Sequence, residues 1–507
     1  FTTDGLCPKI IEVIKVVHAN GTLEIIRVIQ IGKDSCSLSL DEWLNPTALK
    51  KAIYKIKGQT GQIIEKQEVY LASALDSLHE KNAKFRTEYR FCGWYQGRFL
   101  IPNSPSLQES ETVVSELPYD IQGGKEKEAQ KALELLLETA QTQGPILFAS
   151  SLLAPLLEPL MLSRFGLFLS ARAGAGKTEL VKMMMCLYGS KWSSDQLLSF
   201  AGTTDNAALK KAEIARGLPF PIDNFRPQDG HTPRLQNMTI AIMEGQSKAR
   251  LDRNGESKEQ IQISCLPILT GEDFHEGDAG LIGRCLVLHF PPTNRLPISQ
   301  WLNLKKQTKE HLPALGRQWL LFLETNLKSE TWRIEADNHF QSIWSNWQKE
   351  AQKKGYGKVQ NIERVTRNIA ALELTFWLAS ECPVLSDTIS KHYDHFAKGC
   401  SDLLDDMCRQ NQEKSPGMIA VERLLDAIIA RTVLFQEEGS PISKDPRPGQ
   451  TILGWKRSDG TFYLLCTQFK DWLQKQEPVF KSLSETRIYK IFEEEGFIVS
   501  TEKDRYT

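Results

Sequence analysis

The sequence predicts an α/β protein built on a P-loop core, with a smaller α+β domain before the core and helices after it. A strand-like run at 165–170 leads into the loop Ala-Arg-Ala-Gly-Ala-Gly-Lys-Thr at 171–178, and an apolar helical pattern follows at 179–188. Residues 298–435 are almost entirely helical by periodicity. Further strand patterns recur between these segments, at 218–223, 262–270 and 284–290.

Shifts in composition and turn signals divide the chain into segments. Two β-rich runs at 8–17 and 22–31 flank Asn20-Gly21, a hairpin signal, and residues 91–102 are typical of a second tight hairpin. Stretches rich in Ser, Pro and Glu indicate linkers. We expect an N-terminal α+β domain at 1–102, a linker at 103–126, the P-loop core with its preceding helices at 127–297, a helical lid or bundle at 298–435, a linker at 436–450 and a winged-helix-like module at 451–507.

Composition narrows the class of protein. A chain of 507 residues is too long for one core. The net charge of −1 argues against a broadly basic nucleic-acid surface, although it allows a local basic pore in a ring. The ten cysteines show no paired spacing and predict reduced thiols in the cytoplasm. No apolar run reaches the ~18 residues that a membrane span needs, so we expect no membrane partner.

The loop at 171–178 has the residue types that hold a polyphosphate. Small residues let successive backbone N–H groups close around phosphates, and the following helix directs its positive end at them. Lys177 is expected to reach the outer phosphates and Thr178 to offer its hydroxyl to Mg²⁺, which predicts ATP and Mg²⁺ as ligands. Ala171 replaces the usual first glycine, which is acceptable if that position needs no positive φ. A chance Gly/Ala loop before a core helix is the alternative. The predicted nucleotide contacts are Ala173, Gly174, Ala175, Gly176, Lys177, Thr178 and Glu179.

Asp223 ends the strand pattern that follows the loop. There it would act as the Walker B carboxylate and hold Mg²⁺ together with Thr178. Pro219 and Pro221 lack ladder donors and suggest that the strand itself is short. The alternative is a turn formed by the Asp-Asn pair.

Asn224 occupies the position where many ATPases place a catalytic glutamate. Its amide can orient a water molecule but cannot take a proton from it. Turnover is therefore slow, or the base comes from elsewhere, with Glu244 and Glu272 as candidates.

Two further strand ends carry candidate catalytic residues. Thr270 is our choice for a sensor 1 residue beside the γ-phosphate, with Glu272 as the second choice and an ordinary strand cap as the alternative. Arg284 precedes the last strand and could act as an arginine finger on a neighbouring subunit's ATP. The alternative for Arg284 is a surface arginine that pairs with an acid.

Two basic segments are candidates for DNA contact. Residues 245–256 contain Asn254-Gly255 and predict an exposed hairpin that could line a pore, carrying Lys248, Arg250 and Arg253. In the C-terminal module, Arg487 and Lys490 lie on one predicted helix and could meet a DNA backbone. A solvated hairpin and a protein-docking module are the respective alternatives.

With these motifs in order, the chain resembles a family of bacterial mobile-element ATPases that carry a domain once catalogued as of unknown function. The family includes the MCM-like helicases of staphylococcal chromosome cassettes and is related to AAA+ replicative helicases. The resemblance implies an AAA+ core in a hexameric ring that moves on single-stranded DNA using ATP. It also implies that Arg364 or Arg367 is a sensor 2 arginine at the nucleotide. The matching stretches, within roughly residues 8–375, are 92–102, 171–178, 202–206, 220–223, 247–250, 269–272, Arg284 and 363–367.

The leading hypothesis is an ATP-dependent DNA helicase or translocase of a mobile genetic element, acting as a homo-hexamer on single-stranded DNA. The alternative is a slow ATPase that serves as a replication initiator or helicase loader without unwinding DNA, which Asn224 and the neutral charge favour. A primase or an initiator is a further candidate partner. A small-molecule kinase is disfavoured because such enzymes seldom carry a long helical region and a winged-helix-like tail.

Overall fold

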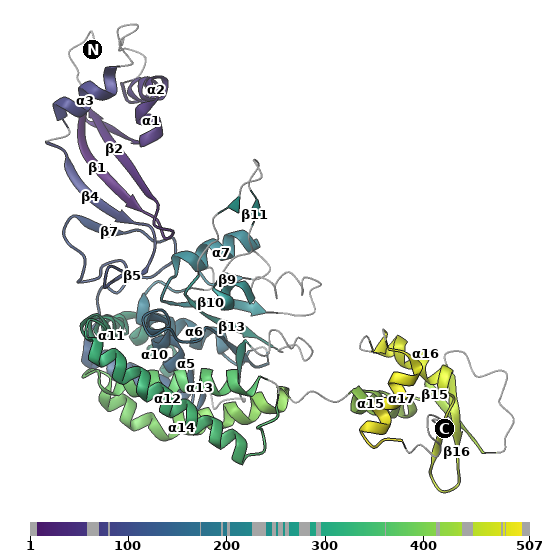
Figure 1. Ribbon diagram of the computed structural model, residues 1–507. Helices are drawn as coiled ribbons and strands as arrows, with labels where there is room; N and C mark the ends of the chain where they lie inside the picture. The colour runs from purple at the N-terminus through teal and green to yellow at the C-terminus, as the bar shows by residue number, and fades with distance from the viewer. Residues whose placement is uncertain are drawn as a thin grey trace. The chain divides into compact units, whose positions relative to one another are not determined.

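The computed structural model (Figure 1) forms two compact units, Phe1–Asn411 and Gln412–Thr507. The first unit contains two five-stranded sheets and the long helices. The second unit, yellow in Figure 1, has a core of its own. The structure describes residues 8–57, 70–79, 82–172, 174–193, 196–199, 203–225, 240–245, 250–251, 257–258, 263–272, 284–290, 296–359, 361–411, 416–438, 450–477, 480–481 and 483–498.

The N-terminal region is a mixed sheet with helices packed around Trp43. The predicted hairpin at 8–17 and 22–31 is confirmed, because its two strands pair antiparallel. Asp76 connects two helices to the sheet through hydrogen bonds. Its carboxylate accepts from Arg27 Nε on a strand at 3.0 Å and from Trp43 Nε1 on another helix at 3.1 Å. The sheet has the order β3-β2-β1-β4-β7. Its elements are β1 (Lys9–Val17), β2 (Leu23–Ile31), β3 (Asp34–Ser39), α1 (Leu40–Leu44), α2 (Pro46–Lys57), α3 (Leu71–His79), β4 (Lys84–Tyr89) and β7 (Glu111–Val113).

The segment predicted as a linker at 103–126 is part of the folded unit. Strand β7 pairs in parallel with β4, and Leu117, Tyr119 and Ile121 are buried in the main core. The Ser, Pro and Glu content indicated a solvated connection. The segment is folded because apolar side chains at every second position pack into that core.

Glu111 fastens β7 to the hairpin of β5 (Gly93–Tyr95) and β6 (Arg98–Leu100). Its two carboxylate oxygens accept from Arg98 Nη1 at 2.7 Å and Nη2 at 2.9 Å, and Tyr89 OH donates at 2.9 Å. The Arg98 hydrogen bonds lower the pKa of Glu111 to about 2. Burial, and then the bond to Glu111, raises the pKa of Tyr89 to about 12.

Replacing Glu111 with glutamine is expected to lower the free energy of unfolding by about 2 kcal/mol at pH 7. The folded pKa lies below the ordinary carboxyl value of 4.5, so the stabilisation is complete above pH 4.5 and is lost as the pH falls towards 2. Urea unfolding of the wild type and Glu111→Gln should therefore differ most at neutral pH and converge in acid. A difference that does not change with pH would contradict this assignment.

The second sheet is parallel throughout and has the order β14-β8-β13-β10-β9. Its strands are apolar without alternation, as expected of a sheet covered on both faces. Because all strands run the same way, their carboxyl ends share one edge and their amino ends share the other. The strands are β8 (Gly166–Ser170), β9 (Leu198–Ser199), β10 (Pro219–Phe225), β13 (Leu266–Gly271) and β14 (Cys285–His289), and nearby helices include α5 (Gln143–Leu153), α6 (Lys177–Met185) and α7 (Asp205–Ile214).

Strand β10 is longer than its two prolines predicted, with seven residues. Leu218 O accepts from Leu266 N at the start of β13, so alternate residues of β10 direct their backbone groups to that strand. Pro219 and Pro221 therefore face the opposite side. There Pro219 O accepts from Tyr119 OH at 2.8 Å, and β9 begins to pair only at Ile222. The two prolines lack an N–H, but no hydrogen bond between β10 and β13 depends on these positions.

The helical region continues the core of the second sheet. Helices α13 and α14 contact α5, and α10 and α11 contact α4. Among the described residues, no helix is long and apolar enough to cross a membrane. The nine described cysteines are free, and seven of them are buried. The helices are α4 (Glu126–Thr139), α10 (Ile298–His311), α11 (Pro313–Asn326), α12 (Glu330–Lys353), α13 (Ile362–Ser380) and α14 (Ser386–Asn411).

The C-terminal unit begins earlier than the predicted linker at 436–450. The boundary falls after Asn411, so α15 belongs to this unit and not to the predicted bundle at 298–435. The hairpin of β16 and β17 precedes the two helices that follow, and Phe497 and Ile498, the last described residues, form no strand. The winged-helix-like module stays a prediction. The elements are α15 (Pro416–Ile429), β15 (Val433–Glu437), β16 (Thr451–Lys456), β17 (Phe462–Leu464), α16 (Cys466–Gln476) and α17 (Glu485–Glu494).

Candidate functional site

Three side chains from separate elements converge at the carboxyl edge of the parallel sheet. Asp223, near the end of β10, accepts from Thr178 Oγ1 at 3.0 Å through its Oδ1. Thr270 Oγ1, near the end of β13, donates to the same oxygen. Thr270 is only 2% exposed, so its hydroxyl has little access to water. The three residues that the sequence predicted separately thus form one cluster of oxygen atoms.

Two glycines of the loop before α6 have a backbone conformation that favours glycine. Gly174 and Gly176 have φ of +76° and +87°, and a Cβ at Gly176 would point into open space. Ala171 is not among the described residues with positive φ, so the missing first glycine imposes no strain. Its N–H donates to Gly271 O at 3.3 Å, which fixes the loop's start against β13.

Lys177 begins α6 with its amine held inside the loop. Nζ donates to Ala171 O at 2.7 Å and to Arg172 O at 3.4 Å. Burial lowers the pKa of Lys177, and the charges of Glu272 and Asp223 oppose that shift. A charged amine that is partly desolvated and bound only to neutral carbonyl oxygens would bind a phosphate more strongly than it binds those oxygens.

The backbone conformation at position 224 favours asparagine. Its φ is +61°, and the pairing of β10 with β13 shifts register between Ile222 and Phe225. Asparagine adopts the left-handed region more readily than glutamate does. The side chain is exposed beside Asp223 at the carboxyl edge, where it could orient a water molecule.

The two candidate bases lie at opposite edges of the sheet. Glu272 directly follows β13, and its backbone O accepts from Ser170 Oγ at 3.0 Å, which places it beside the loop. Glu244 instead accepts from Arg284 Nη2 at 2.8 Å near the amino edge. Glu272 thus lies beside the loop of its own chain and Glu244 lies away from it, and the choice of a base stays a prediction.

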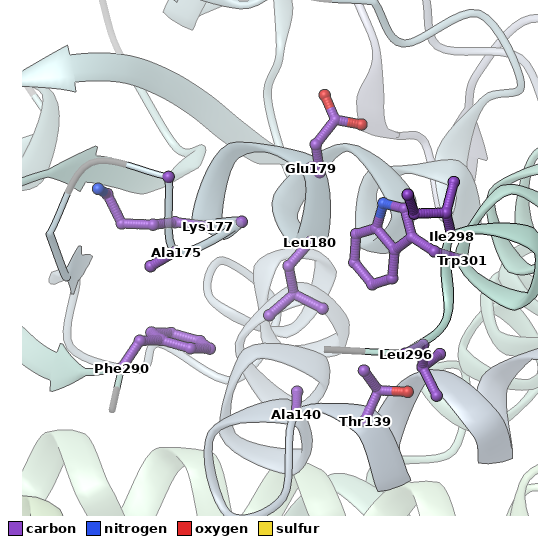
Figure 2. A pocket seen from close by; sticks show the side chains of 12 residues that line it. Thr139, Ala140, Ala175, Lys177, Glu179, Leu180, Phe290, Leu296, Ile298 and Trp301 are labelled. Atoms are coloured by element: carbon purple, nitrogen blue, oxygen red, sulfur yellow. The ribbon is translucent and has the colours of Figure 1, made fainter. Parts of the chain in front are cut away.

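An apolar cavity of about 290 Å³ opens beside the loop (Figure 2). Its walls come from α4, the loop, the segment after β14 and α10. Figure 2 shows the Trp301 indole directed toward the pocket, whereas the Glu179 carboxylate points away from it. Such a cavity suits a flat apolar group attached to a phosphate chain. It is lined by Thr139, Ala140, Gly174, Ala175, Gly176, Lys177, Glu179, Leu180, Phe290, Leu296, Ile298 and Trp301.

Glu179 was predicted as a nucleotide contact, but its carboxylate has other partners. It forms ion pairs with Lys182 on its own helix and with Lys305 on α10. Hydrogen bonds from these two lysines lower the pKa of Glu179, against the effect of burial. Its side chain thus connects α6 to α10, and its predicted contact with a nucleotide stays a prediction.

Arg284 lies at the amino edge of the sheet, away from the loop of its own chain. Its backbone O accepts from Gly166 N at the start of β8, and the five residues of β8 separate this edge from the loop by about 17 Å. Its guanidinium pairs with Glu244. The predicted alternative, a surface arginine paired with an acid, therefore describes its contact within the chain.

Arg364 and Arg367, on the first turns of α13, line the same cavity as Arg284. This open cavity has a volume of about 590 Å³ and also includes Arg164. The guanidinium of Arg367 lies 5.2 Å from the centroid of the Trp344 ring. The two arginines therefore lie with Arg284 and away from the loop at 171–178 of their own chain, and their sensor 2 role stays a prediction.

Several predicted contacts fall outside the described residues. These are Ala173, Lys248 and Arg253, together with the side chain of Arg250. The backbone of the predicted hairpin is partly described, because β11 (Arg250–Leu251) pairs antiparallel with β12 (Ser257–Lys258). In the C-terminal unit, Arg487 and Lys490 are both exposed on α17, and Arg487 lies 3.6 Å from Glu494.

Comparisons with known proteins agree with the fold. A domain of unknown function (DUF927) matches residues 35–262, less than half of the chain. Among solved structures, the chain is similar to the SCCmec type IV Cch active helicase, with a TM-score of 0.60 and 16% identity over 98% of this chain and 91% of that one. The apo NrS-1 C-terminal region matches with a TM-score of 0.32 and 10% identity over 72% of this chain and 87% of that one. No curated protein matches the sequence.

Sequence reasoning missed Arg164 and the walls of the apolar cavity. Arg164 precedes β8 as Arg284 precedes β14, and this shared position before a buried strand was a usable signal. Trp301 and Phe290 gave no such signal, because an apolar residue on a helix or at a strand end usually indicates core packing.

Proposed function

We propose that this protein is an ATP-dependent helicase or translocase that moves on single-stranded DNA as a ring. The observation that carries the proposal is the convergence of Thr178, Asp223 and Thr270 beside Lys177 at one edge of a parallel sheet. Ligands of open α/β sheets bind at the carboxyl ends of the strands. The adjoining apolar cavity fits the base of ATP.

The residues fit Mg²⁺ and a triphosphate. Hydroxyl and carboxylate oxygens are the donors that Mg²⁺ prefers, and Thr178 and Asp223 supply one of each. Bound there, the ion neutralises phosphate charge. Thr270 holds the Asp223 carboxylate in place, Lys177 pairs with the outer phosphates, and Asn224 or Glu272 positions the attacking water.

Replacing Thr270 with valine is expected to lower ATP turnover about tenfold with little change in nucleotide affinity. Valine keeps the volume but removes the hydroxyl that donates to Asp223, so the carboxylate loses one of its two fixed donors. Steady-state hydrolysis and nucleotide titration measure the two effects. Thr270→Ser retains the hydroxyl and should keep most of the activity. Equal loss in both variants would show that packing, not the hydrogen bond, matters.

A ring would complete the site across subunits. Arg284, Arg164, Arg364 and Arg367 gather at the edge opposite to the loop, where they cannot serve their own chain. If the amino edge of one subunit faces the carboxyl edge of the next, these arginines meet the neighbour's triphosphate. Arg284 would then give up its ion pair with Glu244. This assembly makes Arg284 a finger supplied in trans and gives Arg364 or Arg367 a nucleotide contact.

The proposal that DNA is the partner is supported by the fold and by the basic hairpin. The fold is similar to that of a protein named as an active helicase. The pairing of β11 with β12 supports a hairpin that carries Lys248, Arg250 and Arg253 into a central pore. Contacts of this kind act on phosphates and are independent of sequence.

A second candidate is a slow ATPase that acts as an initiator or helicase loader. Asn224 favours it, because an amide beside Asp223 can orient a water molecule but cannot take a proton from it. Separation of a forked DNA duplex decides between the two functions. A helicase separates it when ATP is present, and a loader does not.

A further inference from the structure

A second large cavity borders the tight hairpin of β5 and β6 and takes no part in the proposed ATP cycle. Its volume is about 590 Å³, and we call it the hairpin groove. It lies near the amino edge of the parallel sheet, since Arg216 comes shortly before β10. The residues that matter for its chemistry are Trp94, Tyr95, Arg216, Glu324, Lys328 and Arg333.

The hairpin side of the groove is fixed in place. Gly93 has φ of +107°, and a Cβ there would lie 2.4 Å from Arg216 O, so the two segments touch directly. Trp94 Nε1 donates to Pro155 O at 2.6 Å. Phe99 N donates to Glu324 Oε1 at 2.6 Å. These contacts join the hairpin to three other parts of the unit, so the groove is formed before any ligand binds.

The two acids that line the groove are already engaged. Glu324 accepts from Phe99 N with one oxygen and from Ser106 Oγ with the other, at 2.5 Å. Glu158 accepts from Arg216 through both of its oxygens. Arg216 neutralises Glu158, whereas Glu324 keeps its negative charge because both of its donors are neutral. Its two oxygens are nevertheless held by Phe99 N and Ser106 Oγ, and no other contact that the structure describes directs them at a ligand.

The opposite wall carries cations without acidic partners. Lys328 and Arg333 are exposed at the junction of α11 and α12, and neither pairs with any residue that the structure describes. With Arg216, they outnumber the two acids. Trp94 and Tyr95 are half-buried and line the same cavity as these cations. The groove therefore combines aromatic rings with unpaired positive charge.

We propose that the hairpin groove binds single-stranded DNA, with one or two nucleotides seated in the cavity. Phosphates would contact Lys328 and Arg333, and a base would stack on Tyr95 or Trp94. An acidic protein segment would satisfy the cations but would leave the aromatic rings without a matching group. The inference rests on the proposed function for the identity of the polymer, but it concerns a site separate from the pore hairpin and the ATP site.

Charge reversal of both cations tests the proposal. The variant with Lys328→Glu and Arg333→Glu is compared with a control in which Lys349→Glu and Lys353→Glu change the same charge elsewhere on α12. Anisotropy titrations use fluorescent oligo-dT in the full chain. We expect at least tenfold weaker binding in the groove variant and wild-type binding in the control. Because the variant no longer neutralises two phosphates, the slope of log K against log salt should become shallower by about 1.4.

Crosslinking locates the strand and separates the possible failures. Oligo-dT carrying 4-thiothymidine should crosslink to the peptide that contains Trp94 and Tyr95. Binding to DNA with crosslinks only in residues 245–256, and unchanged affinity in the groove variant, would overturn the groove assignment while leaving the proposed function intact. Wild-type protein that binds no DNA would overturn both. Binding of labelled polyglutamate that the groove variant loses, together with oligo-dT binding that the groove variant keeps, would assign the groove to an acidic protein segment instead.

Discussion

Replacing Lys177 with alanine is expected to abolish the proposed ATP hydrolysis, lowering turnover by at least about a hundredfold. The Lys177 amine donates hydrogen bonds to two loop carbonyl oxygens, and its charge lies beside Asp223 and Glu272. In the complex it would transfer those contacts to the outer phosphates. Alanine removes this cation, and Arg172 is then the one positively charged side chain left in the loop sequence 171–178.

The measurement is steady-state release of phosphate, with nucleotide titration beside it. Lys131→Ala is the matched control, because Lys131 is exposed on α4 and pairs with Glu128 on the same helix. The control should hydrolyse ATP at the wild-type rate. Unchanged turnover in Lys177→Ala would contradict the assignment of the loop as the phosphate site.

Replacing Arg284 with alanine is expected to reduce hydrolysis by about 10³ while nucleotide binding is retained. Binding survives because Arg284 lies at the sheet edge opposite to the loop, where it pairs with Glu244. Hydrolysis is expected to fail because, in the proposed ring, the neighbour's triphosphate would lose the charge that stabilises the transition state.

Mixing the two inactive variants tests whether Arg284 acts across subunits. In a ring with equal amounts of Lys177→Ala and Arg284→Ala subunits, about a quarter of the interfaces combine an intact Lys177 with an intact Arg284. Activity should therefore return in part. Arg409→Ala, an exposed arginine on α14 near Asp406, serves as the control and should remain active alone. If no mixing ratio restores hydrolysis, Arg284 has only the structural role of pairing with Glu244.

The meeting of Asp223 and Thr270 at the carboxyl edge could be predicted from the sequence because each lies near the end of a strand. Parallel strands bring their ends together, and the loop that leads to Thr178 follows the end of a third strand, β8. The direct contact of both hydroxyls with one oxygen of Asp223 follows from side-chain rotamers and could not be foreseen.

Other features could not be predicted because they depend on contacts between distant segments. Arg284 and Arg364 are 80 residues apart in the chain, and only the packing of α13 brings them into one cavity. Asn224 suggested a missing catalytic acid, whereas its positive φ shows that the backbone itself favours asparagine. The boundary after Asn411 was missed because α15 continues the helical periodicity while packing with a different core.

ATP-dependent separation of a forked DNA duplex tests the central proposal most directly. The full chain is incubated with a labelled fork, Mg²⁺ and ATP, beside Lys177→Ala and a reaction without ATP. The proposed function predicts strand separation only by the wild-type protein with ATP. No separation, together with hydrolysis that single-stranded DNA stimulates, would contradict the helicase assignment and favour the initiator or loader.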